Sequence, residues 1–104
     1  MDRQFVEAIY ATLFAIPEGK VVSYGVLAGL AGFPGRARQV GRCLKELPTG
    51  SGLPWHRVVN AQRRLSFPSN SAKYREQKQR LLSEGVVFDR QLIRAEHFLE
   101  DFSE

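Results

Sequence analysis

The sequence holds one cysteine, one methionine, one tryptophan and two histidines among 104 residues. A single cysteine excludes an internal disulfide and fits a reducing cytosol. The two histidines, His56 and His97, are too few ligands for zinc. No apolar run approaches the ~20 residues of a membrane-spanning helix, and the first residues lack the apolar segment of a signal peptide. We therefore expect a cytoplasmic protein without metal, cofactor or membrane anchor.

Acidic residues are scarce in the middle of the chain. Residues 36–80 contain eleven Lys and Arg against two Glu, a net charge of +9 by difference, whereas the whole chain carries +4. Beyond Arg94 the chain has four acidic residues and no Lys or Arg. Such a concentrated positive segment suits a polyanion such as nucleic acid. The same pattern also fits a solvated basic surface.

Apolar periodicity and turn residues predict four helices in a single domain. These helices are expected over 3–15, 24–31, 36–47 and 72–84. Ser23 is expected to cap the second helix, and Gly85 to end the fourth. Phe14 and Leu82 are among the residues expected to face the core.

The predicted helix over 36–47 has two chemically different faces. Its apolar side comprises Ala37, Val40, Gly41, Leu44 and Leu47. Arg38, Arg42 and Lys45 cluster on the opposite side, because successive side chains of a helix lie about 100° apart. Two short helices joined by a Gly-containing turn, the second one basic, predict a helix-turn-helix.

A short hairpin is expected to complete the fold as a basic wing, with Val58-Val59 as one strand and 63–65 as the other. Residues 90–104 are expected to form a last helix or a tail, acidic from about 95. The predicted class is therefore mainly α with a short β hairpin, a winged helix-turn-helix-like single domain over 1–104.

The most distinctive motif is Pro54-Trp55-His56-Arg57-Val58-Val59. It resembles the Pro-Cys-His-Arg-Val active-site motif of the O6-alkylguanine-DNA alkyltransferases, with Trp55 where the reactive Cys would stand. Three further blocks resemble that family in the same order, namely 22–28, 37–41 and 81–85. The resemblance covers 20–88 and corresponds to the family's C-terminal, DNA-binding domain, without its N-terminal domain. A Trp for the Cys identifies the chain as similar to the alkyltransferase-like subfamily.

The resemblance implies that alkyl transfer is lost. In the family a cysteine thiolate attacks the alkyl group, His acts as base through a water and Glu orients the His. His56 and Glu84 match the last two, but an indole at position 55 is no nucleophile. Cys43, on the edge of the third helix, is expected to be a small buried residue. We therefore expect no enzyme activity and a structural role for His56 and Glu84.

The resemblance still implies that the protein recognises lesions. The implied lesion- and DNA-binding residues are Tyr24, Arg38, Arg42, Lys45, Pro54, Trp55 and Arg57. The basic helix would lie in the minor groove, Arg38 would fill the space left by an extruded nucleotide, and Tyr24 would press on its phosphate. Trp55 would form a wall of the pocket. Arg57 either reaches the base edge or a phosphate, or only braces the loop.

The leading hypothesis is a monomeric, non-enzymatic sensor of O6-alkylguanine in double-stranded DNA, associated with the nucleoid when bound, which flags lesions for nucleotide excision repair proteins. The alternative is a helix-turn-helix regulator that reads sequence without lesion preference. A residual enzyme using His56 is a third reading, for which we find no nucleophile. Two features depart from the family, Leu47 in place of Asn and the loop over 66–70, and they leave the size of the pocket open.

Overall fold

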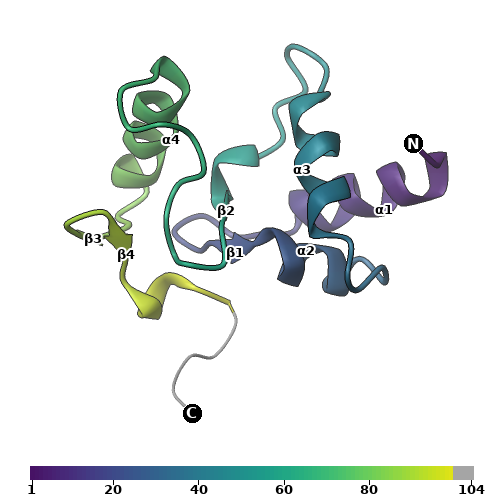
Figure 1. Ribbon diagram of the computed structural model, residues 1–104, viewed down its shortest axis with the longest axis horizontal. Helices are drawn as coiled ribbons and strands as arrows, with labels where there is room; N and C mark the ends of the chain where they lie inside the picture. The colour runs from purple at the N-terminus through teal and green to yellow at the C-terminus, as the bar shows by residue number, and fades with distance from the viewer. Residues whose placement is uncertain (100–104) are drawn as a thin grey trace.

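Four helices and two small pairs of strands make up the part of the chain that the computed structural model describes, residues 1–99 (Figure 1). The helices are α1 (Arg3–Phe14), α2 (Tyr24–Leu30), α3 (Ala37–Lys45) and α4 (Ala72–Ser83), with 3-10 turns η1 (Trp55–Arg57) and η2 (Ala95–His97). The strands are β1 (Val22–Ser23), β2 (Val58–Val59), β3 (Phe88–Asp89) and β4 (Leu92–Ile93). All four predicted helices are confirmed, with small differences at their ends.

Local signals set the ends of these helices. Ser23 and Ser71 cap α2 and α4, because each side-chain oxygen accepts a hydrogen bond from the backbone N–H three residues further on. Just beyond α4 and its C-cap Glu84 stands Gly85, whose φ of +88° is a conformation that glycine adopts without strain. The N–H groups of Gly85 and Val86 return to the carbonyls of Leu82 and Leu81 and satisfy the open end of the helix.

A parallel pair of strands separates two apolar cores. Strand β1 pairs with β2 in the register Val22 to Val58 and Ser23 to Val59. Val22 and Val58 join the core of α1, α2 and α3, whereas Val21 and Val59 join the core of α4 and β4, because successive strand residues point to opposite faces. Figure 1 shows α1–α3 on one side of this pair and α4 with the β3–β4 hairpin on the other.

The predicted hairpin between Val58-Val59 and 63–65 is wrong. Both valines are buried, which is typical of a strand covered on both faces, and β2 pairs with the distant β1 instead. The segment after β2 is a turn in which the Asn60 side chain accepts hydrogen bonds from the N–H groups of Gln62 and Arg64. The hairpin of this fold is β3–β4, which is antiparallel. The predicted class, mainly helical with a short hairpin, is confirmed.

Residues 90–99 do not form the predicted helix or tail, because 90–93 complete the β3–β4 hairpin and Phe98 packs in the second core. The Phe98 side chain is 6% exposed, and residues Val21 and Phe98 form an isolated parallel bridge. The rest of the predicted acidic tail, 100–104, lies outside the described residues. No helix within 1–99 is long and apolar enough to cross a membrane.

Two expected core residues are exposed, Phe14 at 76% and Leu82 at 48%. Each directly follows a fully buried leucine, Leu13 and Leu81 respectively. One residue along a helix rotates the side chain by about 100°, and this rotation turns Phe14 and Leu82 away from the core.

Candidate nucleic-acid interface

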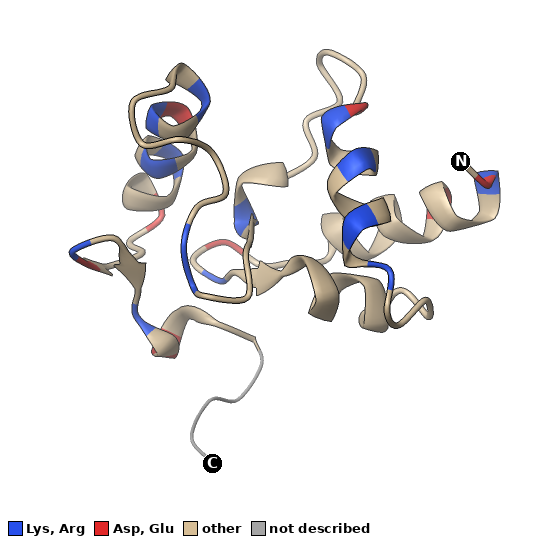
Figure 2. Cartoon of the chain, in the orientation of Figure 1, with Lys and Arg blue, Asp and Glu red and all other residues tan. Residues whose placement is uncertain are grey.

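Helix α3 presents a basic face to solvent. Arg38, Arg42 and Lys45 are exposed, while Val40 and Cys43 anchor the other side of the helix in the first core. The positions of these cations run along α3 in blue in Figure 2. Within residues 1–99 none of the three side chains has a hydrogen bond or ion pair. Their charges are therefore available to an external anion, as the sequence predicted.

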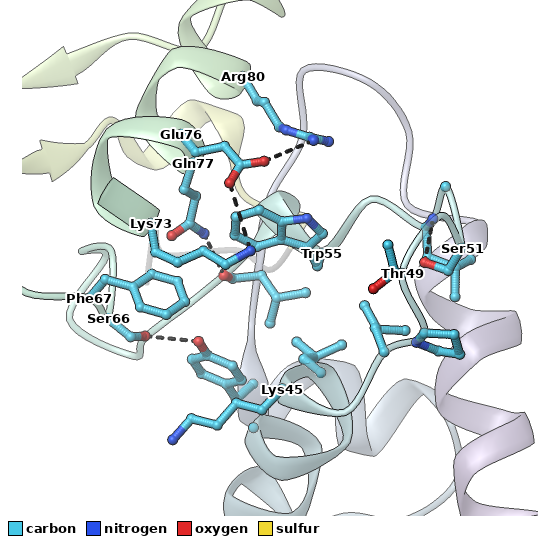
Figure 3. Close-up of a pocket in the computed structure, with 18 of the residues that line it drawn as sticks. Lys45, Thr49, Ser51, Trp55, Ser66, Phe67, Lys73, Glu76, Gln77 and Arg80 are labelled. Carbon is cyan, nitrogen blue, oxygen red and sulfur yellow. Dashed lines mark hydrogen bonds and ion pairs between the residues drawn. The ribbon is translucent and has the colours of Figure 1, made fainter. Parts of the chain in front are cut away.

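Trp55 lies on the wall of a cavity of about 920 Å³. The cavity opens between the end of α3, the loop over 48–53, the loop over 66–68 and one face of α4 (Figure 3). The Phe67 ring meets the indole edge to face, with centroids 6.2 Å apart. The loop that differs from the family's thus supplies part of the wall, and Leu47 lines the cavity as well.

One face of α4 also lines the cavity, which the sequence did not predict. The lining side chains of α4 are Lys73, Glu76, Gln77 and Arg80. At this site the sequence predicted only α3, the motif around Trp55 and Tyr24. Spacings of three, four and seven residues place these polar side chains on one side of a helix. Arg75, Lys78 and Gln79 have the same kind of spacing on another side, so the pattern alone does not single out the cavity face.

The Glu84 carboxylate, at the end of α4, forms hydrogen bonds with three groups from distant parts of the chain. His56 Nε2 and Arg57 Nη2 each lie 2.7 Å from Oε2, and the backbone N–H of Gly19 donates to Oε1 at 3.0 Å. Burial raises the pKa of the Glu84 carboxyl, but the hydrogen bonds from Arg57, Gly19 and His56 outweigh it and hold this pKa at about 2. Glu84 is therefore a carboxylate at neutral pH.

The His56 imidazole is buried and neutral. Burial lowers the pKa of His56, and the charges of Arg57 and Arg80 add to this effect, against the opposing hydrogen bond and charge of Glu84. A neutral ring that donates from Nε2 to Glu84 leaves an acceptor lone pair on Nδ1. That Nδ1 atom is buried without a hydrogen-bond partner among residues 1–99. The predicted His56–Glu84 pair is thus present in the structure.

Arg57, the last residue of η1, braces this turn against α4 and the end of α1. Its guanidinium donates to Glu84 and, through Nη1, to the carbonyl of Ile16 at 2.8 Å. With a side chain that is 15% exposed, Arg57 cannot reach a base or phosphate without breaking these bonds. Of the two roles considered for Arg57, the bracing role fits the structure. Pro54 precedes η1 and does not line the cavity.

Tyr24 lies at the start of α2 and lines the same cavity. Its hydroxyl forms a 2.9 Å hydrogen bond with Ser66 Oγ, which ties α2 to the loop over 66–68. Cys43, by contrast, is 1% exposed and packs in the first core, as expected. Burial raises the pKa of the Cys43 thiol, and Glu46 adds to the shift. The cavity therefore contains an indole and a phenol but not this thiol.

The elements that build this site match the model of a known protein family. Residues 4–86 match the model of the 6-O-methylguanine DNA methyltransferase, DNA binding domain. The chain belongs to this family. The match includes α1 through α4, so it covers the basic helix, the Trp55 motif and the Glu84 carboxylate.

Individual proteins are similar to this chain over most of its length. The chain is 47% identical over 83 residues to a DNA base-flipping protein of Vibrio parahaemolyticus, covering 80% of this chain and 81% of the relative. It is 42% identical to alkyltransferase-like protein 1 of Schizosaccharomyces pombe, covering 80% and 77%. The solved structure of S. pombe Atl1 in complex with damaged DNA containing O6-carboxymethylguanine superposes with a TM-score of 0.84 at 34% identity, covering 97% of this chain and 99% of that one.

Proposed function

We propose that this protein binds O6-alkylguanine in double-stranded DNA, turns the damaged nucleotide out of the duplex and holds it without removing the alkyl group. The single observation that carries the proposal is Trp55 on the wall of the cavity, next to an intact His56–Glu84 pair. The relatives named for base flipping and for binding damaged DNA support the recognition step. The chemistry of residue 55 supports the absence of transfer.

Transfer of an alkyl group from guanine O6 requires a nucleophile within reach of the alkyl carbon. The indole of Trp55 offers a π face and an N–H donor but no ionisable thiol. The one thiol of the chain, on Cys43, is buried in the first core and has a raised pKa, which keeps it protonated and unreactive. His56 and Glu84 accordingly hold the loop in shape.

Recognition would combine three contributions. Arg42, Lys45 and the N–H groups nearby would contact phosphates and supply affinity that depends on salt. Arg38 would stack in the gap left by the extruded nucleotide, which offsets part of the few kcal/mol that unstacking costs. The cavity wall at Trp55 would gain about 0.8 kcal/mol for each buried methylene of the adduct. The phosphate contacts do not distinguish a lesion from normal guanine. Burial of the adduct and the weaker pairing of the damaged base do, and Arg38 adds to the difference because its gap exists only once the base is extruded.

A binding titration followed by protein mass measurement tests both halves of the proposal. The protein is titrated with matched duplexes that carry guanine or O6-methylguanine, and the intact protein is then weighed. We expect tighter binding to the modified duplex and an unchanged protein mass. Equal affinity for both duplexes would instead favour a helix-turn-helix regulator that reads sequence. A gain of one methyl mass on the protein would contradict the loss of transfer.

We further propose that the protein acts as a monomer and that the bound complex marks the site for nucleotide excision repair proteins. The proposal follows from the resemblance to the alkyltransferase-like subfamily. A reconstituted incision assay on an O6-alkylguanine duplex tests it. Addition of this protein should raise the rate of incision, and an unchanged or lower rate would count against it.

A further inference from the structure

Two cations of α4 lie over the Trp55 indole. Lys73 Nζ is 4.3 Å and Arg80 Cζ is 5.6 Å from the centroid of the ring. The two residues are seven positions apart, two helical turns, and therefore project from the same face of α4. Figure 3 shows both side chains reaching from α4 toward Trp55, with Glu76 between them. Lys73 and Arg80 therefore form a positively charged rim at the edge of the aromatic wall.

The charge of this rim is only partly neutralised. The charged side chains that line the cavity are Lys45, Lys73, Glu76 and Arg80, which gives three positive and one negative, or +2 by difference. Glu76 Oε2 accepts from Arg80 at 3.0 Å, but its Oε1 lies 3.7 Å from Lys73 Nζ, beyond hydrogen-bond range. The Lys73 side chain is 58% exposed. Its ammonium therefore keeps donors for a further acceptor.

An adduct on an extruded guanine would meet the indole first and this rim next. A neutral alkyl chain gains from the indole but gives the cations no acceptor. A carboxylate at the end of the chain provides two oxygens, which match the fork of Arg80 and the ammonium of Lys73. Resting on the function proposed above, we propose that Lys73 and Arg80 make this cavity select O6 adducts that end in a carboxylate over neutral adducts of the same size.

Matched duplexes test the selectivity directly. One carries O6-carboxymethylguanine, one its amide O6-carbamoylmethylguanine, which has nearly the same shape without the charge, and one carries guanine. The Kd of each is measured by fluorescence anisotropy at one salt concentration, and the selectivity is the Kd of the amide divided by that of the carboxylate. A charge-assisted hydrogen bond predicts a selectivity of about tenfold for the natural sequence.

Variants on α4 assign the selectivity to the rim. Lys73→Met and Arg80→Met should each bring the selectivity toward one. Glu76→Gln should raise the selectivity, because it removes the competing carboxylate. Arg75→Met and Lys78→Met are matched controls, since they remove a charge from the same helix but do not line the cavity. The controls should retain the selectivity of the natural sequence.

The possible outcomes separate this proposal from the proposed function. Equal binding of carboxylate and amide, both tighter than guanine, would overturn the selectivity and leave lesion recognition intact. If Lys73→Met weakened all three duplexes by the same factor, Lys73 would be a phosphate contact and the proposal would be wrong. If the Arg75→Met and Lys78→Met controls lost the selectivity too, it would arise from overall charge and not from the rim. Equal binding of all three duplexes would overturn both proposals.

Discussion

His56 and Arg57, neighbours in the chain, bond the same carboxylate oxygen. Nε2 of His56 and Nη2 of Arg57 each lie 2.7 Å from Oε2 of Glu84. Glu84 is 11% exposed, so the arrangement is a partly buried charge pair with a neutral third member. It joins η1, which positions Trp55, to the end of α4, which carries the cations of the cavity. The shape of the cavity therefore depends on one carboxylate.

The first prediction concerns the stability that this carboxylate provides. Glu84→Gln keeps the side-chain volume but leaves the Arg57 guanidinium without its counter-charge. Removing one partner of a buried pair costs about 3 kcal/mol, and we expect the free energy of unfolding to fall by that order in urea titrations at pH 7. Glu76→Gln is the matched control, because its half-exposed ion pairs should contribute under about 1 kcal/mol. Equal losses in the two variants would contradict the prediction.

The second prediction concerns how the stabilisation by Glu84 depends on pH. The pKa of Glu84 is lowered from its ordinary 4.5 to about 2, so the folded state favours the ionised form. The stabilisation is complete above pH 4.5 and is lost as the pH falls toward 2. The difference in unfolding free energy between the natural sequence and Glu84→Gln should therefore shrink across this window. A difference that stays constant from pH 7 to 2 would show that the carboxylate acts through shape and not through charge.

The sequence predicted well what is decided locally. Ser23 and Gly85 mark helix ends because a cap or a positive φ depends only on neighbouring residues. The sequence did not predict contacts between residues that are far apart in the chain. Strand β2 pairs with β1, thirty-six positions earlier in the register Val22 to Val58, and a two-residue apolar strand carries no signal for its partner. A nearby turn made a hairpin the simpler interpretation.

The candidate site was predicted in the same uneven way. The Trp55 motif and the basic face of α3 were found, because one is a continuous stretch and the other follows helical spacing. The cavity face of α4 was not, since a helix with polar residues on most sides does not indicate which side is covered. The role of Arg57 also required the fold, because its partners Glu84 and Ile16 are 27 and 41 positions away.

The third prediction concerns Gln77, a polar residue buried at 1% exposure. Its Nε2 donates to the carbonyls of His56 and Val58, at 3.1 and 3.0 Å, and so holds η1 and β2 against α4. Gln77→Met keeps the volume but removes the donor that two buried carbonyls share, which should cost about 2 kcal/mol of unfolding free energy. Gln79→Met, an exposed change on the same helix, should cost little. Similar stability of the two variants would contradict a clamping role.

The fourth prediction separates the two kinds of DNA contact on α3. Arg38→Ala should weaken binding to O6-alkylguanine duplex more than to unmodified duplex, because only a flipped base leaves a gap for its guanidinium. Arg42→Ala should weaken both duplexes alike and lower the salt dependence by about one unit, as expected for one lost phosphate contact. Arg42 is the better control than Lys45, which lines the cavity. The same lesion-independent loss in both variants would rule out an intercalating role for Arg38.

The last prediction concerns the indole itself. Stacking of a base on an aromatic side chain is worth about 1–3 kcal/mol, so Trp55→Ala should lower affinity for the lesion by roughly tenfold to a hundredfold. Trp55→Phe keeps an aromatic wall and should lose much less. Neither change should alter binding to unmodified duplex, which does not place a base in the cavity.

Because Trp55 is the one tryptophan of the chain, its fluorescence reports on the cavity directly. Lesion duplex should change that signal in the natural sequence, and unmodified duplex should not. An equal fluorescence change with both duplexes would mean that the indole responds to DNA in general.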